Sequence, residues 1–152
     1  MELWDFKEGW LDFYLNEAKE LMGEEYNLLD KAVLEKICQM QVFAALGDYE
    51  LYKEKQFIVG VPYKLLSQSE VEEQVVVQGT IDLLAIGNNK AIIIDYKYSS
   101  ISRDEDIREK YQKQLALYAY AVKKVLKLDV EAHLVNIYSQ KVISFDKESL
   151  KL

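Results

Sequence analysis

Residues 75–100 read VVVQGTIDLLAIGNNKAIIIDYKYSS, and this stretch decides the expected fold. Two strongly apolar strands flank a glycine–asparagine–asparagine turn at 87–89, which is turn chemistry typical of a β-hairpin. The strands nevertheless carry Asp82, Asp95 and Lys97. Burying a charged side chain is costly unless the charge is paired or binds a metal ion. The three charges therefore indicate a site rather than ordinary strand residues.

The spacing of these three residues fits one chemistry. Asp95 and Lys97 are two positions apart, so a strand points both side chains to the same face. Asp82 lies on the antiparallel neighbour and can come alongside them. Two carboxylates and an ammonium on one face are typical of a divalent-metal phosphodiesterase site. The alternative is a buried ion pair with a purely structural role.

The rest of the chain predicts helices packed on a sheet. Helical periodicity over 26–46 changes to strand periodicity at 56, and Pro62 indicates an edge strand or a bulge. The expected strands cover 56–66, 74–86, 91–98, 131–138 and 142–145, and the clearest expected helix covers 106–126. We therefore expect an α/β (α+β) fold with a mixed sheet, in the order helix, three strands, helix, strand, with an extra N-terminal helix.

Composition and charge narrow the class of protein. We expect a single domain over 1–152, with a helical extension at 1–24 and a core at 25–145. Cys38 is the one cysteine, which excludes an internal disulfide and a four-cysteine iron–sulfur or zinc cluster. No apolar run reaches the about 20 residues that span a bilayer, and the acidic start does not resemble a signal peptide. A cytoplasmic protein without membrane contact is expected.

The charge of the chain is unevenly distributed. The net charge of −7 argues against a protein that coats nucleic acid, because such proteins are usually basic. Residues 1–55 carry 13 acidic and 6 basic side chains, whereas residues 97–127 carry 8 basic and 4 acidic ones. Local sign matters more than net charge for a polyanionic ligand. The alternative for the lysines at 123, 124 and 127 is a solvated helix end.

Three motifs in order resemble the PD-(D/E)XK nuclease superfamily: Gly79-x-x-Asp82, Asp95-x-Lys97 and Gln114-x-x-x-Tyr118. The stretch at 75–100 and YQKQLALYAYAVKKVL at 111–126 closely resemble the C-terminal nuclease domain of AddA/RecB-type helicase–nucleases, AddA in particular. EKQF at 54–57 is similar to a recurrent Glu-x-x-Phe of that family. The resemblance covers residues 25 to 145.

The resemblance implies a metal site. Asp82, Asp95 and the backbone carbonyl of Tyr96 would be the protein's ligands to Mg²⁺ or Mn²⁺, and hard oxygen ligands suit these cations. Lys97 beside the metal would stabilise transition-state charge or orient the attacking water. Glu54 is a weaker candidate for supporting the metal, and a solvated charge is the alternative for it.

Two further residues would complete the site. Gln114 and Tyr118 are one helical turn apart and so lie on one face. They would hydrogen-bond a DNA backbone or a motif carboxylate, whereas Tyr118 alone could equally be a packing residue. Tyrosines near the site, including Tyr98, could stack on bases of a single strand or could simply pack.

The chain departs from the family pattern in one respect. RecB/AddA-type nucleases are expected to carry a histidine metal ligand upstream of these motifs. The single histidine here is His133, which follows the motifs and is expected to be an ordinary strand residue. There is no G-x-x-x-x-G-K-[ST] motif, so no ATP motor is expected in this chain.

The sequence therefore supports a Mg²⁺- or Mn²⁺-dependent DNA nuclease domain, an exonuclease or endonuclease. The resemblance implies a role in double-strand break processing and recombinational repair. The implied partners are DNA, expected to be single-stranded, helicase domains and a second subunit. Two alternatives are a catalytically weak or inactive nuclease-like module that binds DNA or a partner subunit, and a hydrolase of another phosphate substrate.

Overall fold

The computed structural model describes residue 20 and residues 31–152. Most of the expected N-terminal extension at 1–24 therefore lies outside the described residues. The described elements are α2 Lys31–Cys38, α3 Gln41–Ala44, β1 Glu50–Pro62, α4 Tyr63–Leu66, β2 Gln74–Gly87, β3 Lys90–Lys97, α5 Asp104–Leu126, β4 Asp129–Asn136 and β5 Lys141–Phe145. The expected mixed α/β class and the order of its core elements are confirmed.

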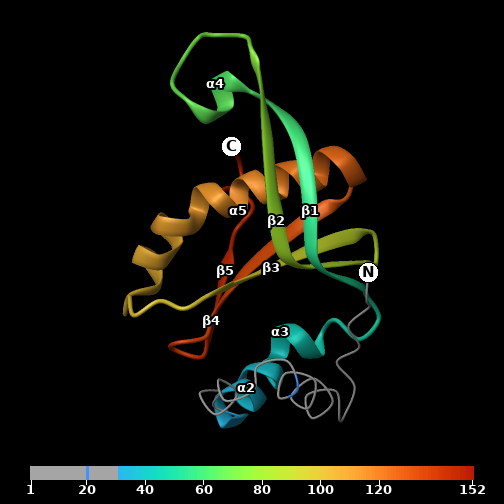
Figure 1. Cartoon of the computed structure of the whole chain (residues 1–152), viewed down its shortest axis with the longest axis vertical. Coiled ribbons are helices and arrows are strands. Elements are labelled where there is room, and N and C mark those ends of the chain that lie inside the picture. The colour runs from blue at the N-terminus through green and yellow to red at the C-terminus, as the bar shows by residue number, and fades with distance from the viewer. Residues whose placement is uncertain (1–19, 21–30) are drawn as a thin grey trace.

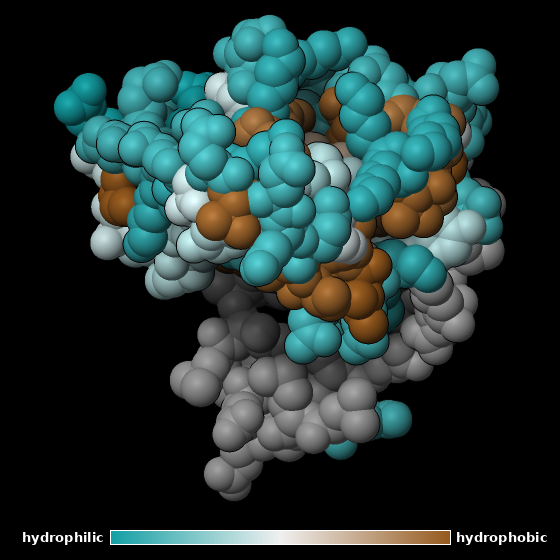
Figure 2. All heavy atoms as spheres, turned by 90° about the horizontal axis from the view of Figure 1, so that it is seen from above, coloured by the Kyte–Doolittle hydropathy of each residue, from teal (hydrophilic) through white to brown (hydrophobic). Residues whose placement is uncertain are grey.

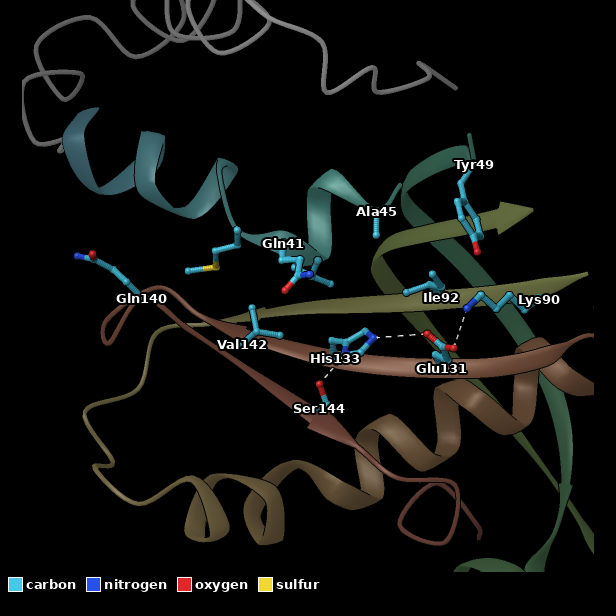
Figure 3. Close-up of a pocket in the computed structure, with 12 residues that line it drawn as sticks. Gln41, Ala45, Tyr49, Lys90, Ile92, Glu131, His133, Gln140, Val142 and Ser144 are labelled. Atoms are coloured by element: carbon cyan, nitrogen blue, oxygen red, sulfur yellow. Dashed lines mark hydrogen bonds and ion pairs between the residues drawn. The ribbon is translucent and has the colours of Figure 1, made fainter. Parts of the chain in front are cut away.

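The sheet has five strands in the order β1-β2-β3-β4-β5. β3 and β4 pair in parallel, and every other neighbouring pair is antiparallel. A parallel pair needs a crossover connection, and α5 provides it. Figure 3 shows α3 on one side of the sheet and α5 on the other. β3 is therefore covered on both faces, which explains its unbroken apolar run at 92–94.

Each face of the sheet has its own core. The face toward α5 buries a cluster that includes Ile81, Ile93, Leu115, Val122 and Leu134. The face toward α2 and α3 buries a second cluster that includes Ile37, Phe43, Leu83, Ile94 and Val135. Because side chains alternate along β3, Asp95 and Lys97 share the face of Ile93, toward α5.

Two expected elements differ in the structure. Residues 63–66 form the short helix α4 rather than the end of a strand, because Pro62 cannot donate a ladder hydrogen bond. Tyr63 N instead donates to Glu73 O over 2.7 Å, which closes the connection. The expected helix over 26–46 is interrupted after Cys38, and Met40 is extended. The prediction that Pro62 marks an edge strand is confirmed, since β1 lies at the edge of the sheet.

β1 and β2 form a long hairpin that extends beyond the other strands (Figure 1). Its register passes from Lys53–Leu83 to Lys55–Ile81, and Glu54 between them has a left-handed φ of 50°. At this point the side chains of β2 switch from one face of the sheet to the other. Leu84 and Ile81 are an odd number of positions apart, so regular alternation would place them on opposite faces, yet both join the core under α5. Asp82 therefore lies where the hairpin is distorted.

The outer part of the hairpin carries exposed apolar side chains. Ile58 and Val76 are 70% and 73% exposed. Figure 2, which looks onto this end of the molecule, shows separate hydrophobic patches among hydrophilic side chains. Within the described residues, no helix has the length and apolarity required to cross a membrane.

Gly79 lies where the hairpin meets α5, and we predict that Gly79→Ala is destabilising. A Cβ there would lie 2.8 Å and 2.9 Å from ring atoms of Phe57 and 3.3 Å from Tyr118. The two rings pack edge to face with centroids 5.5 Å apart, so they have little room to move. Overpacking of this kind costs about 1–3 kcal/mol, measured as the free energy of unfolding in urea.

The matched control for Gly79→Ala is Gly47→Ala, because a Cβ at Gly47 would meet nothing within 4 Å. Replacing the clashing ring with a smaller side chain, by Phe57→Val in the Gly79→Ala background, should restore part of the lost free energy of unfolding. Equal stability of the two single glycine variants would contradict the prediction.

Candidate active site

The candidate site begins where β2 and β3 separate. Their pairing ends at Leu83 and Ile94, whereas β3 continues to pair with β4 as far as Lys97. Beyond that point Tyr96 N donates to Asp82 Oδ2 over 2.8 Å. A side chain thus takes over the hydrogen bond that the neighbouring strand no longer provides, and it holds Asp82 against the end of β3.

Asp95 is the most deeply buried charged residue of the site, with a side chain 3% exposed. Lys97 Nζ lies 3.0 Å from Asp95 Oδ2. This contact is not aligned as a hydrogen bond, and within the described residues Oδ2 has no hydrogen-bond partner. Burial raises the pKa of Asp95, the nearby Lys97 opposes this rise, and the charge of Asp82 adds to it. The two carboxylates are therefore close enough to repel each other.

Lys97 and the helix residues complete the group. Lys97 Nζ lies 5.0 Å from the centroid of the Tyr111 ring, in cation–π contact. Gln114 Nε2 donates to the Tyr118 hydroxyl over 3.0 Å. Burial raises the pKa of Tyr118, and the charges of Asp95 and Asp82 act in the same direction. The structure thus brings all the residues that the three motifs supply to one region under α5.

A cleft of about 780 Å³ adjoins this region. Its lining comes from β2, α4, α5 and the C-terminal residues, and it includes Gly79, Gln114 and Tyr118. Asp82, Asp95 and Lys97 are not part of the lining. Tyr118 therefore lies between the cleft and the carboxylates. Both alternatives for this tyrosine, a packing role and a site role, are compatible with that position.

The donor set of the site fits a hard divalent cation. Asp95 presents a buried oxygen with no hydrogen bond, and the charge of Asp82 already acts on it. A cation between two such carboxylates would offset their repulsion. In a strand the N–H and C=O of one residue point to the same side, so the Tyr96 carbonyl faces the same edge as its N–H, toward Asp82. The Tyr96 side chain stacks on Phe43 in the opposite core and takes no part.

Glu54 lies across from Asp82, between the paired positions Lys53–Leu83 and Lys55–Ile81. Its side chain is exposed on β1. Among residue 20 and residues 31–152, no group of three or more His, Cys, Asp or Glu side chains could hold a metal ion together. From the described residues, the contribution to a cation in this region would be at most two carboxylates and a backbone carbonyl.

Sequence reasoning missed Asn136, which organises the backbone behind Lys97. Its side chain is fully buried at the end of β4. Nδ2 donates to Ser99 O over 2.9 Å, and Oδ1 accepts from Ser99 N over 3.1 Å and from Tyr138 N over 3.2 Å. Ile137 N donates to Lys97 O over 2.8 Å. The available signal was a polar amide that ends the apolar run of β4, where a buried amide needs partners.

His133 faces away from the candidate site. It pairs with Ile94, on the face of the sheet that packs against α3. Figure 3 shows it in a cavity of about 540 Å³, with Gln41 and Tyr49 across from it. Its Nδ1 lies 2.8 Å from Ser144 Oγ, and its Nε2 lies 3.8 Å from Glu131 Oε2. His133 therefore cannot substitute for the upstream histidine ligand expected from the family, because the sheet lies between it and Asp95.

We predict that His133 makes the fold less stable as the pH falls. Burial lowers its pKa below the ordinary value, and Lys90 adds to this, while Glu131 opposes it. Between about pH 6.5 and the lower folded pKa, the unfolded chain binds more protons than the folded chain, so stability rises with pH in that window. The His133→Gln variant should lose less stability than the unaltered protein between about pH 8 and about pH 5.5.

The measurement is the free energy of unfolding in urea at both pH values. Ser144→Ala is the matched control, because it removes the hydroxyl partner and keeps the imidazole. An unchanged pH dependence in His133→Gln would show that other groups cause it.

Several proteins that are similar in sequence to this chain share one function in their names. The chain is 32% identical over 97 residues to the A subunit of the ATP-dependent helicase/nuclease of Streptococcus agalactiae serotype Ia, which covers 63% of this chain and 8% of that protein. It is 30% identical over 125 residues to the same subunit of Listeria innocua serovar 6a, covering 70% and 10%. The match to the Streptococcus uberis subunit is 24% over 135 residues, covering 84% and 11%.

The chain thus spans about a tenth of the length of these relatives. The expected resemblance to AddA-type subunits is confirmed. A family model described as the PD-(D/E)XK nuclease superfamily matches residues 4–151, which include all three motifs of the site. With the mixed sheet and the motif residues gathered where β2 and β3 separate, this match shows that the chain belongs to the PD-(D/E)XK nuclease superfamily.

Proposed function

We propose that this chain is a DNA nuclease domain that uses Mg²⁺ or Mn²⁺ to hydrolyse phosphodiester bonds. The observation that carries the proposal is the pair of neighbouring carboxylates, Asp82 and Asp95, with Lys97 Nζ 3.0 Å from the buried one. This arrangement suits a divalent cation, and membership of a nuclease superfamily gives the substrate bond.

Asp82, Asp95 and the Tyr96 carbonyl would hold the cation. When bound, the cation would polarise a phosphate oxygen and lower the pKa of a water molecule. Lys97 has a side chain 22% exposed, so its ammonium can reach both Asp95 and a substrate phosphate. Its positive charge would stabilise the negative charge that develops on the phosphoryl oxygens. The Tyr111 ring beneath Lys97 limits where that ammonium can go.

Gln114 and Tyr118 would position the substrate. Each lines the cleft beside α5, and the hydrogen bond between them fixes the direction of the hydroxyl and the amide. A phosphate oxygen or a motif carboxylate could accept from the Tyr118 hydroxyl. The raised pKa of Tyr118 keeps this hydroxyl protonated, and therefore able to donate, at neutral pH.

The similar helicase/nuclease subunits suggest a setting for this activity. We propose that helicase domains deliver single-stranded DNA to the site, that a second subunit takes part, and that the biological role is processing of broken DNA in the cytoplasm. The acidic excess of residues 1–55 would weaken DNA binding by this chain alone, since phosphate contacts dominate such binding.

A second function is a weak or inactive nuclease-like module that binds DNA or a partner subunit. It is the function expected of these residues on their own, because none of them supplies the histidine ligand that RecB/AddA-type nucleases are expected to carry upstream of the motifs. Fewer protein ligands leave more positions to water, so a higher metal concentration would be required. Cleavage assays at increasing Mn²⁺ concentration separate the two functions.

Cleavage of labelled single-stranded DNA in Mg²⁺ or Mn²⁺ tests the proposal. Lys97→Ala should reduce the rate by about 100-fold to 1000-fold, as expected when one electrostatic contact to the transition state is removed. Lys123→Ala, an exposed lysine near the end of α5, is the control and should cut at the normal rate. Equal rates in the two variants would overturn the assignment of Lys97.

We further predict that Asp95→Asn abolishes cleavage without unfolding the protein. The amide has the shape of the carboxylate but is a poor ligand for a hard cation. In EDTA the variant should unfold within about 1 kcal/mol of the unaltered protein or be more stable, because repulsion with Asp82 is removed while the Lys97 pair is lost.

Thermal unfolding with increasing Mn²⁺ gives a readout that needs no cleavage. A cation that binds the folded state raises Tm by mass action. The unaltered protein should show this rise, and both Asp82→Asn and Asp95→Asn should lose it. A similar rise in all three proteins would place the cation elsewhere.

A further inference from the structure

We propose that Tyr98 and Tyr138 form a stacking site for a base of single-stranded DNA, next to Lys97. The inference adds a base-binding position to the proposed nuclease function. It rests on that function for its choice of ligand, single-stranded DNA. The two rings pack edge to face with centroids 5.3 Å apart. Their residues are 75% and 53% exposed. Two large aromatic surfaces thus meet in solvent at the end of the sheet where the candidate site lies.

The position of the pair follows from the parallel pairing of β3 and β4. Parallel strands end at the same edge of a sheet, and these two end at Lys97 and Asn136. Tyr98 directly follows Lys97, and Tyr138 follows Asn136 by two positions. The hydrogen bond from Ile137 N to Lys97 O joins the two segments between the tyrosines. A base held by the pair would therefore lie at the edge of the sheet where β3 and β4 end, the same edge at which Lys97 lies.

The backbone under both tyrosines is held by one buried side chain. Asn136 Oδ1 accepts from Ser99 N and from Tyr138 N, and Nδ2 donates to Ser99 O. These bonds fix the residue after Tyr98 and the Tyr138 backbone itself. The fold thus uses a fully buried amide to fix the backbone that carries two exposed rings. A backbone that is fixed before binding loses little conformational entropy when a ligand stacks on its side chains.

The charge around the pair suits a polyanion. Residues 96–103 contain Lys97 and Arg103, residues 136–142 contain Lys141, and neither segment contains an acidic residue. The acidic first turn of α5 follows directly and Arg103 pairs with its Asp106 over 3.9 Å, so the positive charge offered to a phosphate comes mainly from Lys97 and Lys141. Aromatic faces next to cationic side chains are how proteins bind single strands without sequence preference, since every base has a face that can stack. A duplex would not offer such a face, because its bases are stacked on one another.

The test measures binding in EDTA, so that no cleavage is needed. The probes are a short fluorescently labelled oligothymidylate and an abasic strand of the same length. Replacing both tyrosines, Tyr98→Ala with Tyr138→Ala, should weaken binding of the oligothymidylate by about tenfold or more. Replacing both with Phe should leave binding nearly unchanged, because the rings remain. The change should be absent for the abasic strand, which keeps the phosphates and lacks the bases.

Tyr63→Ala is the matched control, because Tyr63 is an exposed tyrosine of α4 at the far end of the hairpin. Equal losses on both strands, no loss on either, or no binding by the unaltered protein would overturn the inference. Unchanged Tm in each variant shows that a loss of binding is not a loss of folding. Cleavage by the unaltered protein is a separate result: base-dependent binding without cleavage overturns the proposed nuclease function alone, and cleavage without tyrosine dependence overturns this inference alone.

Discussion

Backbone groups at the end of the β2–β3 ladder need hydrogen-bond partners. One of these partners is the side chain of Asp82, and this contact helps to form the candidate site. Once the strands part beyond Leu83 and Ile94, Tyr96 N–H has no strand neighbour on that side. Asp82 accepts this hydrogen bond, and its carboxylate is thereby fixed next to Asp95. A buried N–H without a partner would cost about as much as a lost hydrogen bond. The same contact therefore closes the backbone and sets the spacing of the two acids.

Keeping Asp95 buried beside a second carboxylate is unfavourable for the fold alone. Its side chain is 3% exposed, and one ammonium at 3.0 Å offsets part of the cost. Purely structural ion pairs usually have each buried oxygen hydrogen-bonded, whereas Asp95 Oδ2 has no such bond in the described residues. Among the described residues that oxygen has the Lys97 ion pair and no hydrogen bond, so a cation bound there would give it a second favourable partner.

The sequence allowed the placement of several candidate residues to be predicted because the signals for them are local. Strand parity put Asp95 and Lys97 on one face, and helical spacing put Gln114 beside Tyr118. The pleat change at Glu54 and Asp82 was not predictable in this way, since it depends on a left-handed residue that is not glycine. Residues 50–55 were not predicted to be strand because their charges hide the alternation, although Leu51 is buried. The short helix α4 was missed because the effect of a proline depends on the residues after it.

The partners of Asn136 could not be predicted from local pattern, because Ser99, which makes two of its three side-chain hydrogen bonds, lies 37 positions away in the sequence. The role of Asn136 appears only when parallel pairing brings the ends of β3 and β4 together. The same holds for His133, because its separation from the motifs along the sequence does not show on which face of the sheet its side chain lies. Pairing with Ile94 assigns it to the side of α3, across the sheet from Asp95. Long-range strand pairing therefore determines which polar residues come together at the candidate site. The local sequence supplies the residue types that can be brought there.

The two faces of the sheet explain how an acidic chain can present a site for a polyanion. Asp95 is buried on the α5 face and Asp82 is half-buried, so less of their charge reaches a ligand at the edge of the sheet. The residues that surround that edge, at 96–103 and 136–142, are basic or neutral. Under the proposed function, a DNA strand that approaches this edge would meet lysine and aromatic side chains first, and the acids would act on it through a cation. Net charge would then be a poor guide to binding, because burial would separate the charges proposed to hold a metal from those proposed to meet DNA.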